Sequence, residues 1–144
     1  MNLDRIISVQ NSITVFRDGD RCLKVFNEDC AKADVINEAL NQARMEETTV
    51  TVPKILEVTE VNGKWAIVSE YIKGENLEQY VLKNGPVTPK ECYRWACQLC
   101  EAVQYLHQEN SEKPAIIHCD IKPGNVMITR SGDICLIDFN TSLI

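Results

Sequence analysis

The spacing of apolar residues changes its period near Ala31, and this change constrains the fold more than any other feature. Before it, the stretches IISVQ, ITVFRD and RCLKVF carry the β-branched and aromatic residues typical of strands, and DGD supplies a turn between the last two. After it, apolar residues recur at helical spacing, at Ile36, Ala39, Leu40 and Ala43. The sequence therefore predicts three strands followed by an amphipathic helix over residues 31–45.

A hairpin signal predicts two more strands. Asn62 and Gly63 stand between the patterns KILEVTEV and KWAIVSEYI. An Asn-Gly pair is favoured in type I′ turns because both central positions need positive φ. Asn76 then predicts the N-cap of a short helix that ends near Gly85.

A capping box predicts a longer helix. Thr88, Pro89 and Glu91 match its N-cap, first and third positions, and the helix is expected to run to about His107. Its apolar face is expected to hold Ala96, Leu99, Cys100, Val103 and Leu106. Beyond it, NVMIT and ICLIDF read as strands joined by the turn RSGD. This order of strands and helices predicts the α+β class.

The composition excludes several function classes. The chain has 144 residues and a formal net charge of -6, which argues against a nucleic-acid surface because such a surface needs clustered cations. No apolar run approaches the length of a membrane span, and the first residues, MNLDRIISVQ, do not resemble a signal peptide. We therefore expect a cytoplasmic protein that binds no nucleic acid and has no membrane segment in this chain.

The seven cysteines are an odd number and lie within apolar segments. This pattern is typical of an intracellular protein with reduced thiols, most of them buried. Cys97 and Cys100 have CxxC spacing, and His118 with Cys119 could add two zinc ligands. The pair lies inside a helical pattern without turn chemistry, however, which favours packing over a metal site.

Two motifs near the end of the chain carry residues suited to phosphate chemistry. HCDIKPGN, from His118 to Asn125, stands where the protein kinase family has H-R-D-L-x-x-x-N, and DFN stands where it has D-F-G. Together with CLKVF and the hinge-like stretch IVSEYIKGENL, they resemble the bacterial, eukaryotic-like Ser/Thr type of this family. The resemblance implies a five-stranded N-terminal lobe over residues 1–72, and a hinge with a partial helical C-terminal lobe over residues 73–144.

The resemblance implies a catalytic site that uses ATP and Mg²⁺. Asp120 would orient or accept the proton of the substrate hydroxyl, and Lys122 would point at the γ-phosphate. Asn125 and Asp138 are hard oxygen donors that suit Mg²⁺. Each residue taken singly could be an ordinary turn or strand-end residue, but the joint pattern favours the catalytic interpretation.

The N-terminal half supplies the nucleotide-binding residues of the resemblance. Lys24 would hold the α- and β-phosphates, with Glu38 as its ion-pair partner and Glu46 or Glu47 as competitors for that role. The residues implied around adenine are Val15 and Cys22 above it, Met127 below it, the main chain of Glu70 and Ile72 at its edge, and Ser69 as gatekeeper. Simple core packing is the alternative for Val15, Cys22 and Met127.

The sequence departs from the family pattern at four places. SVQNSITVF has no glycine where the family has a glycine-rich loop, Cys119 replaces an arginine, and Asn140 replaces a glycine. The chain also stops at Ile144, before an activation segment, so the resemblance implies the first part of a kinase domain, inactive by itself. Apolar residues left exposed on the helix over 88–107 would favour a homodimer.

Three functions are consistent with these observations. The leading expectation is a Ser/Thr protein kinase that acts on a protein substrate not named by the sequence. The missing glycines and Cys119 favour a non-catalytic pseudokinase or scaffold, and the fold is shared with small-molecule phosphotransferases of the aminoglycoside-kinase type. Lys122 and Phe139 favour a protein kinase, and retention of Lys24, Asp120, Asn125 and Asp138 favours an active enzyme.

Overall fold

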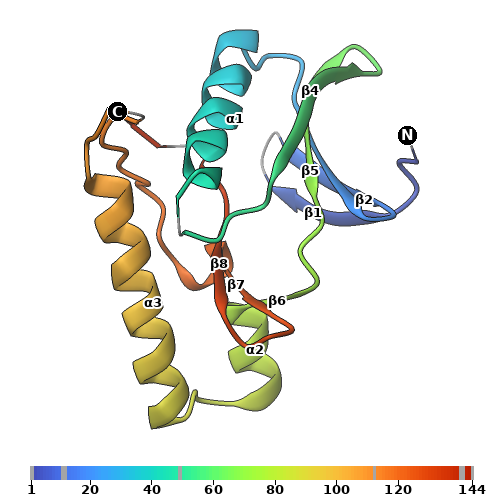
Figure 1. The fold of residues 1–144 in the computed structure, drawn as a ribbon. Coiled ribbons are helices and arrows are strands. Elements are labelled where there is room, and N and C mark those ends of the chain that lie inside the picture. Colours follow the sequence, from blue (N-terminus) through green and yellow to red (C-terminus); the bar gives the residue numbers. More distant parts are fainter. Residues whose placement is uncertain (1, 11–12, 49, 112, 140–141, 144) are drawn as a thin grey trace.

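The strands of the N-terminal half form one five-stranded antiparallel sheet (Figure 1). It is seen in a computed structural model that describes residues 2–10, 13–48, 50–111, 113–139 and 142–143. The strands are β1 (Ile6–Gln10), β2 (Ile13–Asp18), β3 (Arg21–Phe26), β4 (Ile55–Val61) and β5 (Lys64–Glu70). The order in the sheet is β1-β2-β3-β5-β4, so β3, which carries Lys24, is the central strand. All five predicted strands are present.

The two faces of this sheet pack against different parts of the chain, because side chains alternate along each strand. One face holds a small core formed by Leu23, Val25, Ala66 and Val68. On the other face, Phe26 and Ile67 pack against helix α1 (Lys32–Glu46). Val15 and Lys24 are partners in the β2–β3 register, so both lie on the face that α1 covers.

Helix α1 buries a different face from the one that its apolar spacing predicts. Its buried residues are Val35, Glu38, Ala39, Asn41, Gln42 and Met45. Ile36 and Leu40, which were predicted on the apolar face, are 43% and 45% exposed. The prediction was wrong at these two positions because the helix turns Glu38 and Asn41 toward polar partners on other segments.

A second, three-stranded sheet lies next to the first (Figure 1). It consists of β6 (Gly74–Asn76), β7 (Val126–Thr129) and β8 (Ile134–Leu136), in that order. The sequence predicted β7 and β8 but not β6, which is too short to show a pattern. A Cβ on Gly74 would lie 2.1 Å from the main-chain oxygen of Ile128, so glycine is what allows β6 to approach β7.

Helices α2 (Leu77–Asn84) and α3 (Pro89–His107) both begin with the predicted caps. The side chain of Asn76 accepts a hydrogen bond from the Gln79 N–H, and that of Thr88 accepts one from the Glu91 N–H. Each forms a complete capping box, because the side chain of the third helical residue returns a bond to the cap. The positions of both helix starts are confirmed.

The buried face of α3 also differs from the predicted one. Its buried residues are Trp95, Ala102 and Leu106, whereas Ala96 and Cys100 are exposed. The Trp95 indole N–H donates to the Gly132 main-chain oxygen at 2.9 Å. This bond turns the helix so that its largest side chain faces the β7–β8 turn, and the prediction for Ala96 and Cys100 was wrong for that reason.

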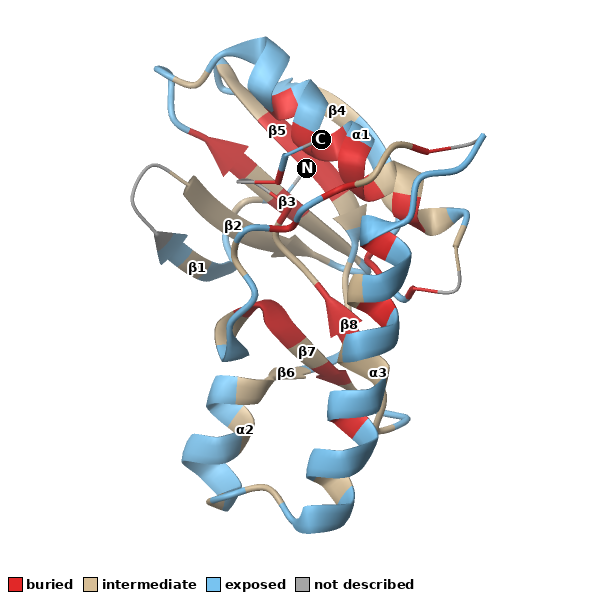
Figure 2. Cartoon of the chain, turned by 90° about the vertical axis from the view of Figure 1, so that its left-hand side faces the viewer, coloured by how far each residue is buried: buried red, intermediate tan, exposed pale blue. Residues whose placement is uncertain are grey.

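Burial is concentrated where the two sheets and α1 meet (Figure 2). Helix α2 has no buried residue, and the outer side of α3 is exposed. All seven cysteines are free. The exposed ones are Cys92, Cys97, Cys100 and Cys119, so the expectation that most thiols are buried was wrong. No helix in the described part of the chain is long and apolar enough to cross a membrane.

Candidate active site

A lysine held between two carboxylates joins three distant parts of the chain. Lys24 of β3 forms an ion pair with Glu38 of α1, and its Nζ lies 3.1 Å from Oδ1 of Asp138, which follows β8. The Glu38 side chain is 3% exposed. Glu46, a competitor for the role of Glu38, instead accepts a hydrogen bond from the main-chain N–H of Ile55.

The charges of this group depend on one another. Burial by itself would lower the pKa of Lys24, but the carboxylates of Glu38 and Asp138 outweigh burial and raise that pKa. Burial also raises the pKa of Glu38; Lys24 opposes this rise and Asp138 adds to it. Glu38 Oε2 is buried and has no hydrogen-bond partner among the described residues. The lysine therefore stays charged and holds together two carboxylates that repel each other.

A second polar group surrounds Asp120. The Asn125 amide nitrogen donates to the main-chain oxygen of Asp120 at 2.9 Å and to its Oδ2 at 3.0 Å. Lys122 Nζ lies 3.9 Å from the same Oδ2, and the Asp120 side chain is 38% exposed. No hydrogen bond is described for Asp120 Oδ1. Within the described residues, the hydrogen bond from Asn125 therefore fixes one oxygen of this carboxylate and not the other.

His118, the first residue of the HCDIKPGN motif, connects the two polar groups, although the sequence analysis gave it no role of its own beyond a conceivable zinc ligand. Its Nδ1 accepts a hydrogen bond from the Asp120 main-chain N–H at 3.1 Å. Its Nε2 therefore carries the proton and donates to the Ile137 main-chain oxygen at 2.9 Å. The ring also packs against Phe139, with ring centres 5.0 Å apart. Its position two residues before Asp120 is the sequence signal that could have indicated this role.

The residues predicted above adenine lie on the same face of the sheet as Lys24. Cys22 and Ser69 are partners in the β3–β5 register, as Val15 and Lys24 are between β2 and β3. Burial raises the pKa of the Cys22 thiol, and the Lys24 charge and the Ser69 hydroxyl partly offset that rise. Met127 alternates along β7 with two buried residues and is itself half-buried, so it lies on the face of β7 away from the core.

The segment after β5 has an N–H group suited to the edge of a ligand. The Glu70 N–H donates to the Lys54 main-chain oxygen at 2.9 Å, and the Tyr71 N–H donates to that of Asp20 at 2.8 Å. In the part of the chain that the structure describes, the Ile72 N–H has no such acceptor. This main-chain donor lies three residues after Ser69, the partner of Cys22 in the β3–β5 register.

Comparison with known proteins shows the family to which this chain belongs. A family model described as the protein kinase domain matches residues 20–143. The chain belongs to the protein kinase family. The match includes Lys24, Glu38, Asp120, Asn125 and Asp138, although it does not assign their roles.

Relatives of this chain include bacterial Ser/Thr protein kinases, the type that the sequence motifs indicated. It is 27% identical to the serine/threonine-protein kinase PrkC of Bacillus subtilis over 87% of this chain and 19% of that protein. It is 33% identical to the probable serine/threonine-protein kinase PknB of Corynebacterium glutamicum over 71% of this chain and 15% of that protein. Serine/threonine-protein kinase B of Synechocystis is 37% identical over 61% of this chain and 15% of that protein. The chain spans less than a fifth of the length of these relatives.

The oxygen atoms of Asn125 and Asp138 are of the type that Mg²⁺ binds. Because the Asn125 amide nitrogen bonds to Asp120, its Oδ1 is the amide atom left for a cation. The Ile137 N–H donates to the main-chain oxygen of Asn125 at 3.0 Å, which brings Asp138 next to Asn125. Asp138 has φ 61°, a left-handed conformation that aspartate tolerates better than most residues. An amide oxygen and a carboxylate side by side are ligands that Mg²⁺ accepts.

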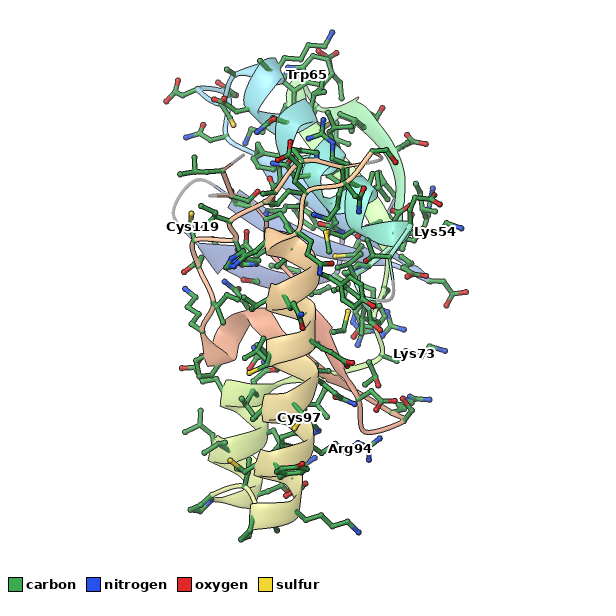
Figure 3. The ribbon with its side chains drawn as sticks, turned by 60° about the vertical axis from the view of Figure 1, so that its left-hand side comes forward. Lys54, Trp65, Lys73, Arg94, Cys97 and Cys119 are labelled. Atoms are coloured by element: carbon green, nitrogen blue, oxygen red, sulfur yellow. The ribbon has the colours of Figure 1, made fainter. Side chains whose placement is uncertain are left out.

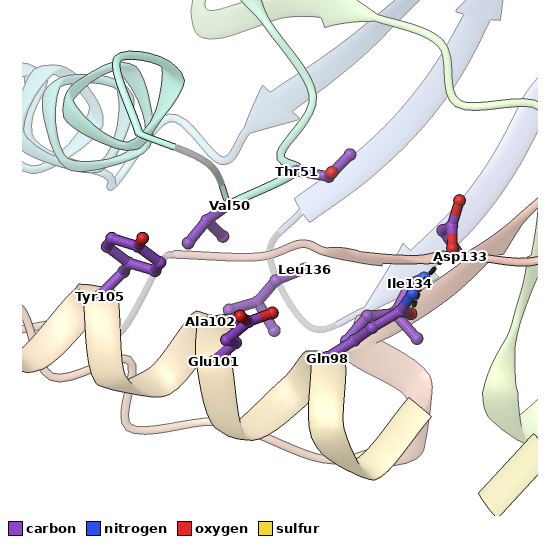
Figure 4. A pocket seen from close by; sticks show the side chains of 9 residues that line it. All are labelled: Val50, Thr51, Gln98, Glu101, Ala102, Tyr105, Asp133, Ile134 and Leu136. Carbon is purple, nitrogen blue, oxygen red and sulfur yellow. Dashed lines mark hydrogen bonds between the residues drawn. The ribbon is translucent and has the colours of Figure 1, made fainter. Parts of the chain in front are cut away.

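Cavity shape does not locate this candidate site. A cavity of about 210 Å³ lies between α3, the loop after α1 and β8 (Figure 4), lined by Val50, Thr51, Gln98, Glu101, Ala102, Tyr105, Asp133, Ile134 and Leu136. A larger one of about 590 Å³ lies between α1 and the end of α3. Neither is lined by a residue predicted to touch ATP or Mg²⁺, so the site is identified by its chemistry.

The residues considered as zinc ligands do not lie close together in this chain. Cys97 lies on α3 and Cys119 in the loop before Asp120, well apart from each other (Figure 3). The described residues contain no group of three or more His, Cys, Asp or Glu side chains that could hold a metal ion.

Cys119, one of the positions that depart from the family pattern, has a backbone φ of 70°. Asn140, and residues 11–12 of the stretch that lacks glycine, lie outside the described residues.

Proposed function

We propose that this chain carries the ATP-binding and catalytic-loop part of a Ser/Thr protein kinase, which transfers the γ-phosphoryl group of ATP to a protein hydroxyl. The observation that supports it most is the pairing of Lys24 with Glu38 and Asp138, next to Asp120 held by Asn125. Phosphoryl transfer needs positioning and charge more than covalent catalysis. These two groups supply both.

Lys24 and the residues implied around adenine would hold the nucleotide. Lys24, kept charged and oriented by Glu38, would bind the α- and β-phosphates. Val15 and Cys22 would lie above adenine with Met127 below it, and the Ile72 N–H would donate to its edge. The division into residues 1–72 and 73–144 is part of this proposal, because it places the nucleotide between the two portions.

Asp120 and the polar residues near it would carry out the transfer of the phosphoryl group. Asp120 Oδ1 would accept the proton of the substrate hydroxyl. The oxygen of that hydroxyl would form a bond to the γ-phosphorus, while the bond between the γ-phosphorus and the oxygen that bridges it to the β-phosphate breaks. Lys122, whose Nζ lies 3.9 Å from Asp120 Oδ2, would bind the transferred group. Asn125 and Asp138 would hold Mg²⁺, which neutralises charge on the phosphate oxygens when bound.

The first test is calorimetric titration of ATP with and without Mg²⁺. Wild-type chain is compared with Lys24→Ala, with Asp138→Ala, and with Lys90→Ala, a control at an exposed lysine of α3. We expect Mg²⁺-dependent binding that both site variants lose and the control keeps. Equal binding by all four proteins would contradict the assignment of Lys24 and Asp138, and absence of binding by the wild type would favour a scaffold.

The second test concerns the transfer itself. Asp120→Asn keeps the size of the side chain but weakens its ability to accept a proton, so we expect transfer to Ser/Thr peptides to be lost while Mg²⁺-ATP still binds. Ser131→Ala, at an exposed serine of the β7–β8 turn, is the control. Unchanged transfer by Asp120→Asn would remove Asp120 from this role.

Location and partners complete the proposal. Seven free thiols and the use of ATP favour the cytoplasm. Tyr93 is 76% exposed, and it lies on α3 with the exposed Cys97 and Cys100. This surface favours a homodimer. Light scattering at micromolar concentration tests it, and a single monomeric species would contradict it.

A further inference from the structure

We propose that Asn41 and Ser142 are positioning residues, whose hydrogen bond holds helix α1 and its Glu38 against the segment that follows Asp138. This proposal rests on the ATP site proposed above. Asn41 Nδ2 donates to Ser142 Oγ at 3.1 Å, although the two residues are 101 positions apart in the sequence. Asn41 is 0% exposed and Ser142 is 6% exposed, so water does not compete for the bond.

Neighbouring groups fix the direction of this hydrogen bond at both ends. Asn41 Oδ1 accepts from Arg44 Nη1 at 3.1 Å, which leaves the amide nitrogen to face Ser142. Ser142 Oγ donates to the Phe139 main-chain oxygen at 2.7 Å and therefore accepts from Asn41. Because a hydroxyl has one proton and an amide has distinct ends, this arrangement specifies one orientation of α1.

The bond closes a ring of contacts around the candidate site. Asn41 follows Glu38 by three residues on α1, and Ser142 follows Asp138 by four. Lys24 contacts both carboxylates. A rotation of α1 that withdrew Glu38 from Lys24 would therefore have to break the Asn41–Ser142 bond as well.

Binding of ATP would replace the contact between Lys24 and Asp138 but would leave the Asn41–Ser142 hydrogen bond in place. Lys24 would turn toward the phosphates and Asp138 toward the cation, so their mutual contact would be exchanged for ligand contacts. Asn41 and Ser142 are not among the residues proposed to touch the nucleotide, so their bond persists. The segment is also fixed from the other side, where Ile117 and Leu143 exchange main-chain hydrogen bonds of 2.8 and 2.9 Å.

A double-mutant cycle tests the proposal. Asn41→Ala, Ser142→Ala and the double variant are compared by calorimetry with Mg²⁺-ATP, and by hydrogen–deuterium exchange of α1 and α3 without nucleotide. Since each single variant loses the same bond, we expect each to weaken ATP binding about three- to ten-fold, and the double variant to lose little more. Exchange should become faster in α1 than in α3.

Control variants of the same residue types are available at exposed positions. Asn37→Ala changes an exposed asparagine of α1, and Ser131→Ala changes an exposed serine of the β7–β8 turn; both should behave like the wild type. Losses that add in the double variant, or exchange that rises equally in α1 and α3, would overturn the proposal, since either indicates general loosening.

Two further provisions keep the test decisive. If the wild type does not bind Mg²⁺-ATP, the proposed function fails, but exchange of α1 without nucleotide still decides whether the bond positions the helix. If the alanine variants do not fold, Ser142→Cys keeps the size of the side chain and weakens the hydrogen bond. Faster exchange confined to α1 is again the supporting result, and unchanged exchange overturns it.

Discussion

The helix that packs on the large sheet and the two helices of the other part of this chain differ in the contacts that hold them. Helix α1 turns polar groups inward, and Glu38 and Asn41 bind Lys24 and Ser142. Helix α3 buries Trp95, Ala102 and Leu106 instead, and α2 buries no residue. Helix α1 also buries Val35, Ala39 and Met45, so the difference is that the part carrying the lysine site adds buried polar and charged contacts to apolar packing, whereas α2 and α3 depend on packing and caps.

Removing the buried cation should have the largest effect. Lys24→Met leaves Glu38 and Asp138 facing each other without a counter-charge, and breaking a buried ion pair from one side costs about 3–5 kcal/mol. Urea unfolding measures the loss, and Lys90→Met on exposed α3 should change the free energy of unfolding by less than about 0.5 kcal/mol. Equal losses in the two variants would break the comparison.

The same ion pair predicts how stability depends on alkaline pH. The pKa of Lys24 is raised in the folded state, so the folded protein holds this proton more tightly than the unfolded chain does. Its contribution to stability is complete below the ordinary lysine pKa and is lost as pH rises through the folded value. Lys24→Met should abolish this part of the pH dependence when unfolding is measured from about pH 9, below the ordinary lysine pKa, to about pH 12, above it.

The next largest loss of stability is expected for removal of a buried leucine of the sheet, whereas the same change at an exposed leucine of α2 should have little effect. Leu23 is 0% exposed and Leu82 of α2 is 83% exposed. Leu23→Ala should lower the free energy of unfolding by about 2–5 kcal/mol because it leaves a cavity, and Leu82→Ala should have almost no effect. Thermal or urea unfolding gives both values, and a large loss for Leu82→Ala would show that α2 is covered in solution.

The smallest effect is expected at a helix cap. Thr88→Ala removes the acceptor of the Glu91 N–H at the start of α3 and should cost about 1 kcal/mol. Thr88→Ser, which keeps the hydroxyl, is the control and should recover most of the loss. If Thr88→Ala destabilised the protein as much as Leu23→Ala, the view that packing holds α3 would be wrong.

Local features of the fold could be predicted from the sequence. Asn62 and Gly63 have φ 52° and 79°, as the type I′ hairpin requires, and the caps at Asn76 and Thr88 form as predicted. Each of these depends on residues within four positions of one another. The strand β6 could not be predicted, because its three residues are a strand only through pairing with β7.

The motifs indicated the chemistry of the candidate site, but not how its residues meet. Asp120, Asn125 and Asp138 were selected by type and spacing, and their roles remain predictions. The contact of Lys24 with Asp138, the two bonds of His118 and the Asn41–Ser142 bond were not predicted. His118 lies only two residues before Asp120 in the sequence, yet the bond between them depends on how the loop turns toward Ile137.

The sequence by itself determined the order of the elements apart from β6, the turns, the helix starts and the resemblance to the family, because each depends on residues near one another or on short motifs. The tertiary structure decided which faces of α1 and α3 are buried. Apolar spacing pointed to Ile36 and Leu40, but the charge of Lys24 and the hydroxyl of Ser142 attract the opposite side of α1. Buried polar groups must find partners wherever the fold places them, and periodicity cannot reveal where those partners are.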